Sequence, residues 1–211
     1  MNDGVLLGKR DSDFIAGVLP YEERNPSGNW DAFLPPGEWQ RVNGQETMAC
    51  VSFSAINSIE TQIKFLTGRS INWSDRFTAK MSGTQSFGNY QYKVADSIRK
   101  DGLVLESDWP APANVTWDVY YAEIPDNIKA KGRAFLDQFE VAYEWVEPTK
   151  ASFLHHIKQS PIQLVVYGGG HAVLGFFNEN DIYRFFDSYD PWRKITSELA
   201  WPLKIVVKVK P

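Results

Sequence analysis

The fold is decided by one stretch of the chain, which reads QETMACVSFSA over residues 45–55. It holds Cys50, the only cysteine in 211 residues, at the start of an apolar run. Over residues 50–67 apolar side chains recur at the spacing of an α-helix, and Gly68 follows as a stop signal. The sequence therefore predicts a helix that carries a cysteine at its N-terminal end.

A second motif, far downstream, supplies the partners that a reactive thiol needs. Residues 168–170 are glycines that bring backbone close to the site or to a substrate chain, His171 opens an apolar strand, and Asp187 follows on the next strand. A helix N-terminus and an adjacent imidazolium both favour a thiolate, and a carboxylate fixes the imidazole tautomer. Gln45 is placed to donate its side-chain amide to an oxyanion, together with the N–H of Cys50. The set predicts a thiol acyl-transfer site.

The amino-acid composition argues against several classes of binding partner. The net charge is −4 and no block of Lys and Arg stands out, so nucleic acid is not an expected partner. No run approaches the roughly 18 apolar residues of a membrane span, and no membrane partner is expected. One cysteine allows no internal disulfide and residues 1–10 lack the apolar core of a signal peptide, which favours a cytoplasmic or other reducing compartment. The three histidines and the cysteine lack metal-site spacing, so we expect no metal or cofactor.

The order of the remaining patterns indicates the fold class. Helical patterns cover residues 50–67, 90–99 and 150–158, residues 128–139 are ambiguous, and strand patterns cover 141–146, 162–167, 172–177, 182–186 and 203–209. Residues 178–181 read as a hairpin turn. Helices first and strands later are typical of an α+β protein with a helical part packed on a sheet or barrel.

From residue 45 onward the chain resembles the papain-like cysteine peptidases, in islands that keep the family's order. The islands are Cys50-Val51-Ser52-Phe53-Ser54-Ala55 (the second half of the nucleophile motif), Gly88-Asn89-Tyr90 (the glycines and aromatic of the cleft wall), residues 102–110 (GLVLESDWP), His171-Ala172-Val173 and Asp187-Ser188-Tyr189.

The resemblance implies a single two-lobed domain over residues 1–211, with the active site in the cleft between a helical lobe (45–125) and a strand-rich lobe (126–211). Residues 1–44 are expected to form an N-terminal extension and strand segment. The implied activity is hydrolysis of a peptide or protein substrate through an acyl-enzyme on Cys50. In this reading His171 is the acid and base, Asp187 orients it and Gln45 stabilises the oxyanion. The substrate is expected to lie against Gly88, Asn89, Tyr90 and Gly170.

The chain departs from the family pattern at several positions. Gln45 lies five residues before Cys50, one fewer than usual, and Val51 replaces a tryptophan. Asp187 replaces the usual asparagine, and Tyr189 replaces the tryptophan that shields it. The family's disulfide cysteines are absent, which fits a bacterial or phage chain.

Two alternatives stay open. A catalytically inactive binding or structural module on the same fold would have an ordinary thiol pKa and a cleft blocked by residues 1–44. The second alternative is a related Cys-His-Asp enzyme, either a transglutaminase-like amidase or a double-glycine-leader peptidase. The latter often has Asp-Pro after the histidine strand, and here Asp190-Pro191 lies three residues beyond Asp187. The oligomeric state is not predicted.

Overall fold

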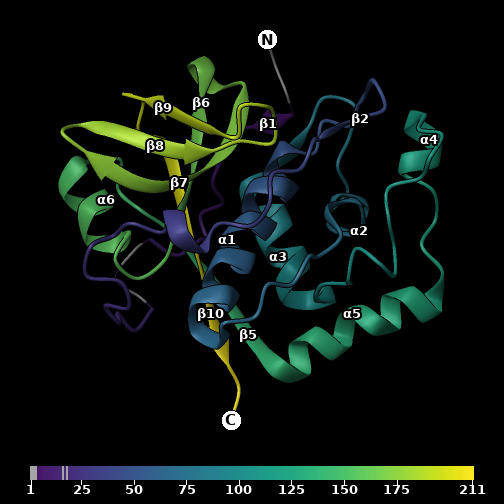
Figure 1. The fold of residues 1–211 in the computed structure, drawn as a ribbon, viewed down its shortest axis with the longest axis horizontal. Coiled ribbons are helices and arrows are strands. Elements are labelled where there is room, and N and C mark those ends of the chain that lie inside the picture. The colour runs from purple at the N-terminus through teal and green to yellow at the C-terminus, as the bar shows by residue number, and fades with distance from the viewer. Residues whose placement is uncertain (1–3, 16, 18) are drawn as a thin grey trace.

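A computed structural model describes residues 4–15, 17 and 19–211 (Figure 1). The helices are α1 Cys50–Thr67, α2 Asp75–Met81, α3 Gln91–Asp101, α4 Trp117–Tyr120, α5 Asp126–Gln138 and α6 Lys150–His156, with short 3-10 turns at Asp31–Phe33 and Tyr167–Gly169. The strands are β1 Val5–Leu6, β2 Arg41–Val42, β3 Gln45–Glu46, β4 Asn89–Tyr90, β5 Phe139–Trp145, β6 Ile162–Val166, β7 His171–Glu179, β8 Ile182–Phe186, β9 Arg193–Thr196 and β10 Ala200–Val209. The predicted α+β class is confirmed.

The molecule has two lobes (Figure 1). One is a six-stranded antiparallel sheet in the order β5-β10-β6-β7-β8-β9. The other gathers α2, α3 and α5 on the opposite side of α1 (Figure 1). Two short pairs, β1 with β4 and β2 with β3, lie outside the sheet.

Helix α1 is the element that joins the lobes. It packs against β6, β7 and β10 on one side and against α2 and α3 on the other. Every residue from Cys50 to Ile63 is buried, as expected for a helix enclosed between two layers. It ends at Gly68, whose left-handed backbone (φ 72°) lets its N–H donate to the Lys64 carbonyl. The predicted helix and its stop are therefore confirmed.

Buried amides fix α1 against the sheet. Gln163 on β6 donates from Nε2 to the Val51 carbonyl (3.0 Å) and to the Ser54 hydroxyl (2.8 Å). Gln62 donates to the Ile205 carbonyl (2.9 Å) on β10. Because a buried polar group without a partner is costly, these bonds favour one register of the helix on the sheet. That register sets where Cys50 lies relative to β7.

The helical part extends further than predicted. Residues 126–138, which we assigned to the strand-rich lobe, form α5, and the chain turns to strands at Phe139. Only Gly132 and Phe135 of α5 are buried, so its apolar pattern is too sparse to distinguish a helix from the sequence. The backbone of α5 at Gly132 lies so close to the end of α3 that a Cβ on Gly132 would be 2.5 Å from the Asp101 carbonyl oxygen.

Within the described ranges no helix is both long and apolar enough to traverse a bilayer.

Candidate active site

Three elements that converge at the lobe boundary carry the predicted catalytic residues. Cys50 is the first residue of α1, His171 is the first residue of β7, and Asp187 directly follows β8. The antiparallel pairing of β7 with β8 sets Leu174 opposite Phe186, so the start of one strand lies beside the end of the other. The hairpin at residues 178–181 therefore places the acid beside the histidine.

The three side chains form a connected set. His171 Nε2 lies 2.5 Å from Asp187 Oδ1, and both side chains are fully buried. The Ala172 backbone N–H donates to Cys50 Sγ at 3.4 Å, which fixes the sulfur next to the start of β7. The other ring nitrogen, His171 Nδ1, is buried without a hydrogen-bond partner among the described residues. The imidazole thus contacts the acid through Nε2 and leaves Nδ1 for the thiol.

The pKa values of His171 and Asp187 favour an ion pair between these two side chains. Burial lowers the pKa of His171, but the bond to Asp187, the neighbouring thiol of Cys50 and the charges of both groups outweigh it and raise that pKa to about 10. Burial acts in the opposite sense on Asp187, and the bonds from His171 and Lys194 lower the pKa of this carboxyl below its ordinary value. The imidazole is therefore protonated and the carboxylate ionised at neutral pH.

Lys194 is a member of the site that the sequence did not reveal. It lies on β9, beyond a loop closed by the bond from the Asp187 N–H to the Trp192 carbonyl (2.8 Å). Its Nζ donates to Asp187 Oδ2 at 2.6 Å. No motif points to it, because its role depends on how that loop returns the chain.

Aromatic and polar side chains border the imidazole. The rings of Tyr167 and Tyr189 lie 6.0 and 5.4 Å from that of His171, centroid to centroid. The Tyr189 hydroxyl donates to Glu46, which also accepts from Gln40 Nε2 (2.7 Å). Glu46 thereby ties the loop after β8 to β3. In the sequence, the one feature that could have pointed to Glu46 is its position next to Gln45, the predicted oxyanion donor.

Gln45 lies on β3, and its side chain is turned along the strand. Its Nε2 donates to the carbonyl oxygen of Glu46 at 2.8 Å. An oxyanion role requires this amide to turn toward Cys50, so that role stays a prediction.

The predicted cleft is filled by an N-terminal segment, residues 4–8. Its strand β1 pairs in parallel with β4, so Val5 lies opposite Asn89, and the Asn89 N–H donates to the Gly4 carbonyl (2.9 Å). Val5 is buried in the same apolar cluster as Cys50. Figure 1 shows β1 at the boundary between the sheet and the helices.

This segment also approaches the backbone on both sides. A Cβ on Gly4 would lie 2.3 Å from the Met48 carbonyl oxygen, and one on Gly88 would lie 2.2 Å from the Gly4 oxygen. On the opposite side, Leu7 Cδ1 lies 3.2 Å from where a Cβ on Gly169 would be. The predicted substrate wall of Gly88, Asn89 and Tyr90 therefore holds an extended chain, whereas Gly170 bonds to the Val166 carbonyl (3.2 Å). Cys50 is fully buried and shares its apolar cluster with Val5 of the segment.

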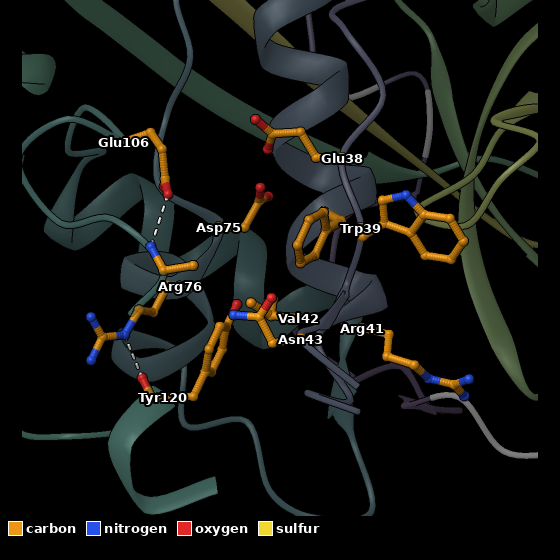
Figure 2. A pocket seen from close by; sticks show the side chains of 11 residues that line it. Glu38, Trp39, Arg41, Val42, Asn43, Asp75, Arg76, Glu106 and Tyr120 are labelled. Atoms are coloured by element: carbon orange, nitrogen blue, oxygen red, sulfur yellow. Dashed lines mark hydrogen bonds between the residues drawn. The ribbon is translucent and has the colours of Figure 1, made fainter. Parts of the chain in front are cut away.

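A separate acidic pocket lies beside α2 and has a volume of about 390 Å³. Figure 2 shows Asp75 pointing into the space between Glu38 and Glu106, with Arg76 and Tyr120 below. Arg76 donates to the carbonyls of Pro110, Val119 and Tyr120 rather than to these acids. Burial and the neighbouring acids raise the pKa of Asp75 well above its ordinary value. The described residues contain no group of three or more His, Cys, Asp or Glu side chains arranged to hold a metal ion.

Comparison with known proteins identifies the fold. No family model matches the sequence, and no curated protein matches it either. Among solved structures, the chain is similar to procathepsin L 3 of the Tenebrio molitor larval midgut, with a TM-score of 0.66 and 15% identity over 98% of this chain and 76% of that one. A recombinant stem bromelain precursor matches with a TM-score of 0.65 and 12% identity, over 95% of this chain and 78% of the other. A Carica candamarcensis cysteine protease matches with a TM-score of 0.61 and 15% identity, over 84% of this chain and 96% of the other. The chain therefore has the two-lobed papain-like fold of these cysteine proteases.

Proposed function

We propose that the chain is a thiol peptidase that cleaves peptide bonds through an acyl-enzyme on Cys50. The observation that carries the proposal is the set of Cys50, His171 and Asp187 at the lobe boundary, with the imidazole bonded to the acid and the sulfur fixed by the Ala172 N–H. Similarity in fold to cysteine proteases supports it.

The geometry supports one path for the proton. Because Nε2 of His171 is bonded to Asp187 and the imidazole is protonated at neutral pH, the proton of the thiol resides on Nδ1 in the resting site, and Nδ1 has no other hydrogen-bond partner among the described residues. The thiolate then attacks the substrate carbonyl carbon, and the amine leaves with the proton from Nδ1. Water attacks the resulting thioester, giving its proton to Nδ1, and the carboxylic acid is released as the thiol forms again.

The oxyanion would form at the N-terminus of α1. The N–H of Cys50 is the backbone donor that this position offers, and the partial positive charge of the helix end favours an anion there. Gln45 is proposed as the side-chain donor after its amide turns from Glu46. The extended substrate would take the place of residues 4–8 along β4.

One observation favours a second candidate, the inactive binding module. That hypothesis predicts a cleft blocked by residues 1–44, and residues 4–8 do fill it. The two candidates differ in whether this segment can leave. In the peptidase it is a removable cover, whereas in the module it is a permanent part of the core.

The test is hydrolysis of unfolded casein by the folded chain, together with intact-mass labelling by iodoacetamide between about pH 4 and 9. An ordinary thiol stops reacting well below its pKa of about 8.5. We expect slow peptide release, and labelling of Cys50 that persists about two pH units below that value. Both should be lost in Cys50→Ala, and His171→Ala should lower peptide release by about a thousandfold.

His156→Ala is the matched control, because His156 is also buried but lies on α6, away from Cys50. It should leave peptide release and labelling unchanged. Labelling confined to the region of an ordinary thiol, with no peptide release, would favour the binding module. Incorporation of a fluorescent primary amine in place of hydrolysis would indicate the amidase alternative.

A further inference from the structure

The acid of the site is held by two cations at once. Asp187 Oδ1 lies 2.5 Å from His171 Nε2, and Oδ2 accepts from Lys194 Nζ at 2.6 Å. Within the described ranges, Lys194 and His171 are the basic side chains in ion-pair contact with Asp187. The Asp187 side chain is fully buried, while that of Lys194 is 22% exposed. The lysine therefore brings a charge from the edge of the sheet to a carboxylate in the interior.

We propose that Lys194 is a positioning residue of the active site, which neutralises the Asp187 carboxylate and holds its Oδ2 so that Oδ1 faces His171. The proposal rests on the proposed function for its catalytic meaning. An isolated carboxylate would bind the imidazolium so strongly that the ring would release its proton reluctantly to a leaving amine. A carboxylate already paired with an ammonium presents a net neutral acceptor, electrostatically similar to the asparagine amide that Asp187 replaces.

Other charges near the pair do not supply this neutralisation. Besides Lys194, several titratable groups lie around His171 and Asp187. They are Cys50, Tyr167 and Tyr189, and the neighbours of Tyr189, Arg41 and Glu46. Arg41 lies over the Tyr189 ring and pairs with Glu46 at 3.6 Å, so these two charges compensate each other. Among the residues that the structure describes, Lys194 forms an ion pair with Asp187 and with no other acid.

The test is a charge cycle read by NMR titration of the His171 ring in the Cys50→Ala background, where no thiol is coupled to it. Removing a positive charge raises a neighbouring pKa and removing a negative charge lowers it. Lys194→Met should therefore raise the His171 pKa by about one unit and Asp187→Asn should lower it by about one unit or more. In the double variant the shifts should cancel to within about half a unit, because the same net charge remains.

Lys194→Arg should leave the titration close to that of the parent, because the charge is kept. Arg193→Met is the matched control, since Arg193 is the neighbouring cation on β9 but pairs with Asp31 at the surface. Lys194→Gln replaces Lys194→Met if the methionine variant does not fold.

A lysine that only held the carboxylate in place, without neutralising its charge toward His171, predicts a different result. Loss of Lys194 would then loosen Asp187 and lower the His171 pKa, as Asp187→Asn does, and the double variant would show no cancellation. Shifts of the same sign, or no shift in Lys194→Met, would overturn the proposal. The titration needs no hydrolysis, so it is independent of whether the chain proves to be a peptidase.

Discussion

Two regions of the molecule combine a histidine, a lysine and an acid in opposite orders. At the lobe boundary Asp187 lies in the middle, between His171 and Lys194. On the sheet, between the paired strands β10 and β5 and helix α6, Lys204 lies in the middle, 3.0 Å from His156 Nδ1 and 2.5 Å from Glu144 Oε1. We refer to them as the cleft trio and the sheet trio.

The order decides the state of each histidine. In the cleft trio the adjacent carboxylate, together with the neighbouring Cys50 thiol, outweighs burial and raises the pKa of His171 to about 10. In the sheet trio burial and the adjacent ammonium both lower the pKa of His156, to about 4. The same residue types therefore give an imidazolium in one place and a neutral imidazole in the other. Composition and burial do not determine protonation, whereas the identity of the nearest neighbour does.

The largest expected effect tests the two lysines as structural elements. Lys204→Met leaves the fully buried Glu144 without its cation, and we expect the free energy of unfolding to fall by about 3–5 kcal/mol. Lys194→Met should cost about 1 kcal/mol or less, because its ammonium is partly solvated and Asp187 keeps His171. Urea denaturation of both variants measures the difference.

A compensated variant serves as the control for this pair. In Glu144→Gln/Lys204→Met the unpaired charge is gone, so most of the loss caused by Lys204→Met should be recovered. Equal costs at the two lysines would show that the burial of Lys204 and Glu144 has no energetic consequence, and would remove the distinction between the trios.

The second effect is the pH dependence of stability, which should have opposite signs in the two trios. The pKa of His156 is about 4 when folded and about 6.5 when unfolded, so the unfolded chain binds the proton first as the pH falls. Its contribution is therefore lost as the pH falls from about 6.5 to 4. His171 has the raised pKa, so its contribution is present below about 6.5 and lost as the pH rises to about 10.

Urea midpoints measured across this range should show both limbs, each of about 1–2 kcal/mol after solvent screening. His156→Gln should flatten the acid limb and leave the alkaline one, and His171→Gln should do the reverse. If either variant flattens the limb assigned to the other, the assignment of neighbours to the two histidines is wrong.

Part of the candidate active site follows from the sequence. Residues 50–67 show a helical period and end at Gly68, so the place of Cys50 at a helix start could be predicted. The hairpin turn before residue 182 brings His171 and Asp187 together, because antiparallel strands joined by a short turn return the chain to its starting level.

The third member of the trio and its cover could not be predicted. Lys194 reaches Asp187 only through the path of the intervening loop, which has no periodic pattern. The segment of residues 4–8 contains a strand of two residues, too short for alternation to be seen, and its placement depends on contacts with residues more than forty positions away. Where a contact is set by a loop or by a distant backbone, local pattern carries no signal.

The smallest effect asks whether the cleft trio is covered reversibly while the sheet trio is buried permanently. Gly4 has a left-handed backbone (φ 110°), and a Cβ there would lie 2.3 Å from the Met48 carbonyl oxygen. Gly4→Val should expel residues 4–8 and raise the initial rate of casein hydrolysis by about tenfold, equivalent to about 1.4 kcal/mol. Gly17→Val is the matched control, because Gly17 has nearly the same backbone (φ 115°) and none of the described residues lies within 4 Å of its Cβ position. It should leave the rate unchanged.

If Gly4→Val exposes Cys50 to iodoacetamide but releases no peptide, the cover does not restrain an enzyme, and the binding module becomes the better description. If Gly4→Val does not expose Cys50, the cover is a permanent part of the core. Both trios are then permanently buried, and they differ only in the order of their charges.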